Sequence, residues 1–83
     1  MFEIVELGGG RGTNALHILD HLMNAHPDVY DQLKVYTIID SSPTLLALQR
    51  DVLIQDSSGE RSHRHASKIK LLQKDLLEVA ENK

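Results

Sequence analysis

The chain has 83 residues, of which 41% are hydrophobic and 25% charged, and its net charge is -3. This composition is typical of a globular protein, and no apolar run approaches the roughly 20 residues of a membrane-spanning helix. The negative charge, with only two tyrosines, one phenylalanine and no tryptophan, argues against a nucleic-acid surface, which is normally rich in Lys, Arg and stacking rings. The lack of cysteine excludes disulfides, thiolate metal sites and cysteine nucleophiles. We therefore expect neither a nucleic-acid partner nor membrane insertion.

An apolar segment near the start of the chain leads directly into a glycine-rich stretch. Residues 2–7, F-E-I-V-E-L, have the composition of a central parallel strand that is covered on both faces. The following residues, G-G-G-R-G, hold four glycines in five positions. Backbone without side chains lets a ligand approach closely, and a helix that begins beyond it directs unpaired N–H groups at that ligand. The stretch therefore predicts a cradle for a nucleotide or nucleoside.

The rest of the chain alternates between helical and strand patterns. After the glycines, the patterns predict a helix from a Thr13 or Asn14 cap to about His26, and then a helical turn or loop over 28–33. A strand is predicted over 34–40, followed by a helix with Ser42 as N-cap and Pro43 in its first turn. The rest of the chain is predicted as a polar loop over 56–66, a strand within 67–73, and a helical turn or short helix over 75–81.

This alternation predicts an α/β fold. Strand, helix, strand, helix, strand with right-handed crossovers gives a parallel sheet, the first half (β-α-β-α-β) of a Rossmann-like doubly wound domain. Three strands are not a whole domain of this kind. Residues 1–83 are therefore expected to form a partial ligand-binding domain.

The spacing of the glycines and the acid before them discriminate between ligands. The dinucleotide fingerprint ends in glycine or alanine, but counting from Gly8 and Gly10 its last position falls on Thr13. The pattern acid-x-G-x-G-x-G does fit, with Glu6 and Gly12 as its ends. A carboxylate here repels a pyrophosphate, whereas it attracts the ammonium and sulfonium of S-adenosylmethionine while loop N–H groups take the carboxylate of that molecule. The residues thus favour S-adenosylmethionine over a dinucleotide.

Two later acids extend the predicted site. Asp40 ends the second strand, where an acid can accept both hydroxyls of a ribose, and Asp75 follows the third strand, where it would face the adenine. Alternative interpretations remain open for each residue. Asp40 could act only in capping the next helix, although capping is compatible with ribose binding. Glu6 could be a solvated acid at the end of a strand, and Asp75 an acid in a surface turn. Arg11 either reaches a carboxylate of cofactor or substrate or is an exposed loop cation.

Three segments, V-E-L-G-G-G-R-G-T, I-I-D-S-S-P-T-L-L-A-L-Q and Q-K-D-L-L-E-V, resemble the cofactor-binding core of the MidA-like S-adenosylmethionine-dependent methyltransferases. The resemblance runs from Phe2 to about Val79, implies a class I methyltransferase fold, and is most specific at Arg11, Thr13, Ser41 and Gln49. Glycine at position 9 replaces a common proline of the family, and aspartate at position 40 a frequent glutamate. The cofactor-binding residues that it implies are Glu6, Gly8, Gly9, Gly10, Arg11, Gly12, Thr13, Asp40, Ser41, Asp75 and Leu76.

The resemblance also implies a function. The family includes the mitochondrial assembly factor that methylates an arginine of a complex I core subunit. The resemblance therefore implies a protein substrate, such as a complex I core subunit, as the partner, and a mitochondrial location if the source is a eukaryote. Family chains continue before and after this core, so the expectation is a segment truncated at both ends and inactive alone, with no catalytic residue assigned. The alternatives are a nicotinamide-dinucleotide-binding fragment of a dehydrogenase and a non-catalytic remnant or interaction module.

Five histidines raise the question of a metal site. His17 and His21 are four residues apart on a predicted helix, but no third ligand is evident, so we expect a solvated helix face. His63 and His65 flank Arg64 in the polar loop, and a solvated loop is expected there. We therefore predict no metal site.

Overall fold

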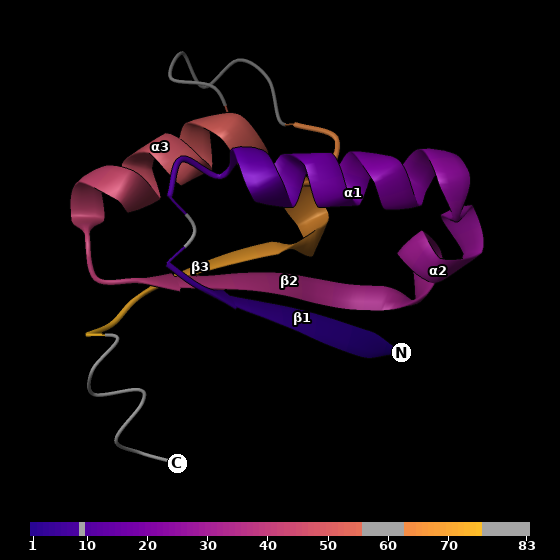
Figure 1. Cartoon of the computed structure of the whole chain (residues 1–83), viewed down its shortest axis with the longest axis horizontal. Coiled ribbons are helices and arrows are strands. Elements are labelled where there is room, and N and C mark those ends of the chain that lie inside the picture. The colour runs from indigo at the N-terminus through magenta and orange to yellow at the C-terminus, as the bar shows by residue number, and fades with distance from the viewer. Residues whose placement is uncertain (9, 56–62, 76–83) are drawn as a thin grey trace.

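The computed structural model describes residues 1–8, 10–55 and 63–75. Three parallel strands, β1 (Phe2–Leu7), β2 (Leu33–Asp40) and β3 (Ile69–Gln73), form one sheet in that order. The helices α1 (Thr13–Ala25) and α3 (Pro43–Leu53) lie on the same face of it (Figure 1). This arrangement confirms the predicted α/β fold and is compatible with half of a Rossmann-like sheet. The predicted helix over 75–81 lies, beyond its first residue, outside the described residues. The other elements are the short helix α2 (Pro27–Gln32), between α1 and β2, and the 3-10 turn η1 (Ala66–Lys68), directly before β3.

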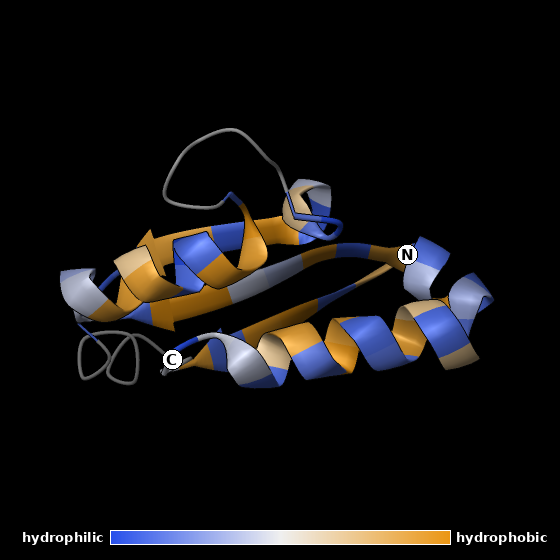
Figure 2. Ribbon diagram, turned by 90° about the horizontal axis from the view of Figure 1, so that it is seen from above, coloured by the Kyte–Doolittle hydropathy of each residue, from blue (hydrophilic) through white to orange (hydrophobic). Residues whose placement is uncertain are grey.

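The core lies between the sheet and the two long helices. Tyr36 of β2 pairs in register with Ile4 of β1 and Ile69 of β3, so the three side chains share one sheet face. Leu19 of α1 and Leu53 of α3 are fully buried against this face. Figure 2 shows apolar residues along the strands and in stripes on both helices. Burial of each large apolar side chain contributes about 1.5–3 kcal/mol, which holds the helices on the sheet.

The first strand differs from its prediction. β1 pairs only with β2 in the described sheet, so it is an edge strand, and β2 is the central one. Val5 and Leu7, which point away from the helices, are 58% and 55% exposed. The prediction of a central strand covered on both faces is therefore wrong for the described residues, because an apolar run reports which side chains favour burial and not which neighbours cover them.

Local capping chemistry explains where the long helices begin. The N-cap of α1 is Gly12, and no side chain caps this helix, so the predicted caps Thr13 and Asn14 are wrong. Gly12 has a φ of +86°, a left-handed conformation that glycine adopts without steric cost. The start of α3 confirms its prediction, since Ser42 Oγ accepts a hydrogen bond from the backbone N–H of Leu45 at 3.1 Å. None of the helices in the described parts of the chain is long and apolar enough to cross a membrane.

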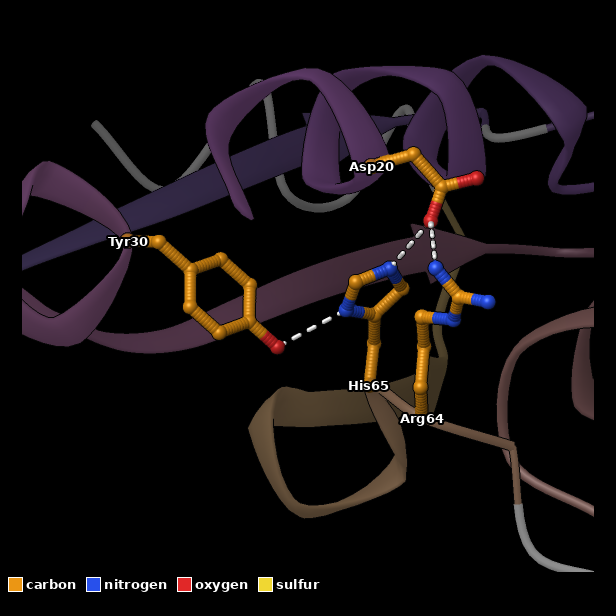
Figure 3. Close-up of polar contacts among 4 residues, drawn as sticks. All are labelled: Asp20, Tyr30, Arg64 and His65. Atoms are coloured by element: carbon orange, nitrogen blue, oxygen red, sulfur yellow. Dashed lines mark hydrogen bonds and ion pairs between the residues drawn. The ribbon is translucent and has the colours of Figure 1, made fainter. Parts of the chain in front are cut away.

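A buried polar network ties the segment before β3 to the first two helices (Figure 3). The imidazole of His65 is only 1% exposed. Its Nε2 lies 2.6 Å from Asp20 Oδ1 on α1, and its Nδ1 lies 2.7 Å from the hydroxyl of Tyr30 on α2. A carboxylate only accepts hydrogen bonds, so Nε2 donates to Asp20, and in the neutral ring Nδ1 accepts from Tyr30. The expectation of a solvated loop is therefore wrong at His65.

Other groups around this network add charge and packing. Arg64 Nη1 lies 3.9 Å from Asp20 Oδ1, and the ammonium of Lys68 lies 4.7 Å from the centre of the Tyr30 ring. Burial, followed by the charges of Asp20 and Asp31, raises the pKa of Tyr30, while Arg64 opposes the shift. Tyr30 therefore keeps its proton and stays a donor. The network lies at the amino-terminal ends of β2 and β3.

Candidate functional site

The carboxyl ends of the three strands form one edge of the sheet. The backbone N–H of Gly8 donates to the carbonyl of Ile39 at 2.8 Å, and that of Lys74 donates to the carbonyl of Asp40 at 3.0 Å. These bonds continue the strand pairing past the ends of β1 and β3. Asp75 follows as an exposed residue at this same edge. Loops beyond the carboxyl ends of parallel strands are the usual ligand-binding region of such sheets.

The glycine loop presents bare backbone at this edge. Gly8, Gly10 and Gly12 all have positive φ, at 74°, 55° and 86°. A Cβ built on Gly10 would meet no atom within 4 Å, so this part of the loop faces open space. The first turn of α1 carries no acidic side chain to occupy its N–H groups. The loop therefore offers an open cradle, in which a ligand carboxylate would meet backbone N–H groups that no acidic side chain of the first turn occupies.

Glu6 lies near the end of β1, two residues before the first glycine of the loop, and is held by a tyrosine. The hydroxyl of Tyr36 donates to Glu6 Oε1 at 2.7 Å. Burial, and then the hydrogen bond to Glu6, strongly raises the pKa of Tyr36, so its hydroxyl remains a donor. Within residues 1–8, 10–55 and 63–75, no Lys or Arg forms an ion pair with Glu6. An acid without a neutralising cation beside a ligand cradle suits a cationic group.

Asp40 is turned into the protein. It is 4% exposed. Its Oδ1 accepts from the backbone N–H of Ser42 at 3.1 Å, and its Oδ2 accepts from Gln49 Nε2 at 3.2 Å. The bond to Ser42 fixes the turn that leads into α3, while the N-cap of this helix is Ser42 itself. A carboxylate offers about four acceptor positions, so these two bonds leave acceptor capacity, and the ribose contact stays a prediction.

Gln49 of α3 links the glycine loop to Asp40 at the end of β2. Its fully buried side chain donates from Nε2 to the carbonyl of Gly10 at 2.8 Å as well as to Asp40. The sequence resemblance singles out this glutamine, but the patterns assign it no role. The signal that could have found it is its place on the apolar stripe of a helix, where a polar side chain needs a buried partner.

Replacing Gln49 by methionine is expected to lower the free energy of unfolding by about 1–3 kcal/mol, since the substitution keeps the volume but removes the donor to the Gly10 carbonyl and to Asp40 Oδ2. The measurement is urea unfolding followed by far-UV circular dichroism. Gln32→Met, at an exposed position of α2, is the matched control and is expected to stay within about 0.5 kcal/mol of the unmodified chain. Equal losses in both variants would show that Gln49 does not hold the loop.

The remaining predicted residues lie on the surface of this edge or outside the described chain. Arg11, Thr13 and Ser41 are exposed. Gly9 and Leu76 lie outside the described residues. Nowhere in the described ranges do three or more His, Cys, Asp or Glu side chains come close enough to hold a metal ion. The edge thus combines an acid, open backbone amides and exposed hydroxyls, which suits a ligand carrying both cationic and anionic groups.

Comparison with known proteins gives one match. A family model described as "Putative S-adenosyl-L-methionine-dependent methyltransferase" matches residues 1–81. No curated protein and no solved structure matches the chain. The matched range includes the glycine loop, Glu6, Asp40 and Gln49 and extends past the end of β3.

Proposed function

The chain belongs to a family of S-adenosyl-L-methionine-dependent methyltransferases, and from this we propose that the carboxyl edge of its sheet is the site that holds this cofactor. The methionine end would lie at Glu6 and the glycine loop, the ribose at Asp40 and Ser41, and the adenine near Asp75 and Leu76. The observation that carries the proposal is the open backbone at Gly10, four residues after Glu6, together with the Glu6 carboxylate, which no described Lys or Arg neutralises.

The bound cofactor would supply a methyl group on a positively charged sulfur. Glu6 would attract the ammonium, and the N–H groups of the loop and of the first turn of α1 would receive the carboxylate. Gln49 would keep Asp40 and the loop in a fixed relation. Methyl transfer depends mainly on holding donor and acceptor in line, so these residues would contribute by positioning. We assign no catalytic residue.

For the acceptor, we propose an arginine side chain of a protein, with a complex I core subunit as the candidate substrate. The support is the resemblance of the segments at 5–13, 38–49 and 73–79 to the MidA-like enzymes. The test is transfer of a labelled methyl group from S-adenosylmethionine to an arginine-containing protein substrate, with the Arg→Lys form of that substrate as control. Equal labelling of both forms would contradict arginine as the acceptor.

Alanine substitution of the two acids tests the cofactor site. Glu6→Ala and Asp40→Ala are each expected to weaken S-adenosylmethionine binding by about 10-fold or more, because each removes a charge-assisted contact. Isothermal titration calorimetry gives the affinities. Glu3→Ala is the matched control, since Glu3 is an exposed acid on the same strand, and it is expected to leave affinity unchanged.

Two results would contradict this site. Unchanged affinity in both Glu6→Ala and Asp40→Ala would refute the assignment of these residues. Binding of NADH by the unmodified chain, with no binding of S-adenosylmethionine, would favour a dinucleotide fold instead.

A further inference from the structure

Tyr36 bonds to Glu6 from the neighbouring strand. In the register of the sheet, Tyr36 lies opposite Ile4, two residues before Glu6, so Tyr36 and Glu6 are diagonal neighbours on one face. A tyrosine side chain is long enough to span this diagonal, and its hydroxyl reaches Glu6 Oε1 at 2.7 Å. The ring is 1% exposed and packs in the core. The hydroxyl is therefore carried by a fixed ring and meets the Glu6 carboxylate two residues before the glycine loop.

This geometry fixes the carboxylate without neutralising it. Glu6 is half-buried, and among the described residues Tyr36 is its one hydrogen-bond donor. A phenol is a neutral donor, so the negative charge of Glu6 is kept, and Oε2 is left to accept from a ligand. The strongly raised pKa of Tyr36, caused first by burial and then by Glu6, keeps the phenol protonated in neutral and mildly alkaline solution. A Lys or Arg in its place would cancel the charge.

We propose that Tyr36 is a positioning residue that sets the preference of the site for ligands with an ammonium group, by holding Glu6 Oε1 and aiming Oε2 at that group. This inference rests on the proposed function, in which Glu6 receives the methionine end of the cofactor. Nucleosides with an amino-bearing side chain would gain from the contact. Nucleosides without one would not.

Tyr36→Phe tests this inference, because it removes the hydroxyl and keeps the ring in the core. Three probes are titrated into the 83-residue chain by calorimetry. S-Adenosylhomocysteine carries ammonium and carboxylate, decarboxylated S-adenosylhomocysteine carries only the ammonium, and 5′-methylthioadenosine carries neither. Tyr36→Phe is expected to weaken the first two by about tenfold, the size of one hydrogen bond to a charged group, and to leave the third within about twofold.

Tyr30→Phe is the matched control, because it removes the hydroxyl of the only other tyrosine, which bonds to His65 in a separate network. It is expected to leave all three affinities unchanged. A double-mutant cycle adds a second measurement. If Tyr36 acts through Glu6, Tyr36→Phe has no further effect on the ammonium-bearing probes in a Glu6→Gln background.

The outcomes separate this inference from the proposed function. An equal loss for all three probes would assign Tyr36 a general structural role and overturn the inference. So would undiminished binding of either ammonium-bearing probe, or an undiminished effect of Tyr36→Phe in the Glu6→Gln background. Failure of the unmodified chain to bind any probe would refute the proposed function and this inference together.

Discussion

Replacing Gly12 by alanine is expected to lower the free energy of unfolding by about 3 kcal/mol, through left-handed strain of about 1–2 kcal/mol and overpacking of at least about 1 kcal/mol. Gly12 has a φ of +86°, and a Cβ there would lie 3.2 Å from Leu53 Cδ1 and 3.3 Å from Gln49 Cα. The second contact is with backbone, which cannot rotate away. Such a loss would be a large part of the roughly 4–12 kcal/mol that stabilises a chain of this length. Urea unfolding followed by circular dichroism measures it.

Gly10→Ala is the matched control for Gly12→Ala. Gly10 also has positive φ, at 55°, but a Cβ there meets nothing within 4 Å. We expect a stability loss of only about 1–2 kcal/mol from strain alone. Ligand affinity should instead fall more in Gly10→Ala than in Gly12→Ala, because the new methyl group of Gly10→Ala would occupy the open side of the cradle. Equal stability losses in the two variants would show that contact with α3 does not explain the glycine at position 12.

The elements that local chemistry controls could be predicted from the sequence. Ser42 and Pro43 mark the start of α3, and the β-branched and aromatic run before Asp40 marks β2. The glycine loop and the acids at the strand ends likewise follow from spacing and from the geometry of parallel sheets. Their joint position at one edge required no knowledge of side-chain contacts.

The contacts that hold the site could not be predicted in the same way. Gln49 bonds to Gly10 across 39 residues of sequence, and Tyr36 to Glu6 across 30. Each bond depends on the strand register and on how α3 packs on the loop, which only the folded chain determines. A polar residue within an apolar stripe indicates that a buried partner exists. It does not say which residue the partner is.

The same reasoning explains the error at His65. Most of the residues that precede it in sequence are polar or charged, so local composition predicts a solvated loop. Its partners Tyr30 and Asp20 are 35 and 45 residues away and lie on two helices. The network that they form is at the amino-terminal edge of the sheet, and the candidate ligand site is at the carboxyl edge. Stability and ligand binding can therefore be perturbed separately in this chain.

His65→Ala is expected to lower the free energy of unfolding by about 3–4 kcal/mol, because it opens a cavity and removes the hydrogen-bond partner of Tyr30 and Asp20. Chemical denaturation of the 83-residue chain measures the loss. His17→Ala is the matched control, because His17 is exposed on α1, and it should stay within about 0.5 kcal/mol of the unmodified chain.

A third variant separates the cavity from the hydrogen bonds. His65→Phe fills most of the space but offers neither donor nor acceptor. It is therefore expected to retain a loss of about 2 kcal/mol, from the buried Tyr30 hydroxyl that it leaves unpaired and from the lost hydrogen bond to Asp20. Because the network lies at the edge opposite the glycine loop, variants that remain folded should keep their affinity for S-adenosylhomocysteine. A stability loss no larger than that of His17→Ala would show that His65 is not held in the buried network of Figure 3.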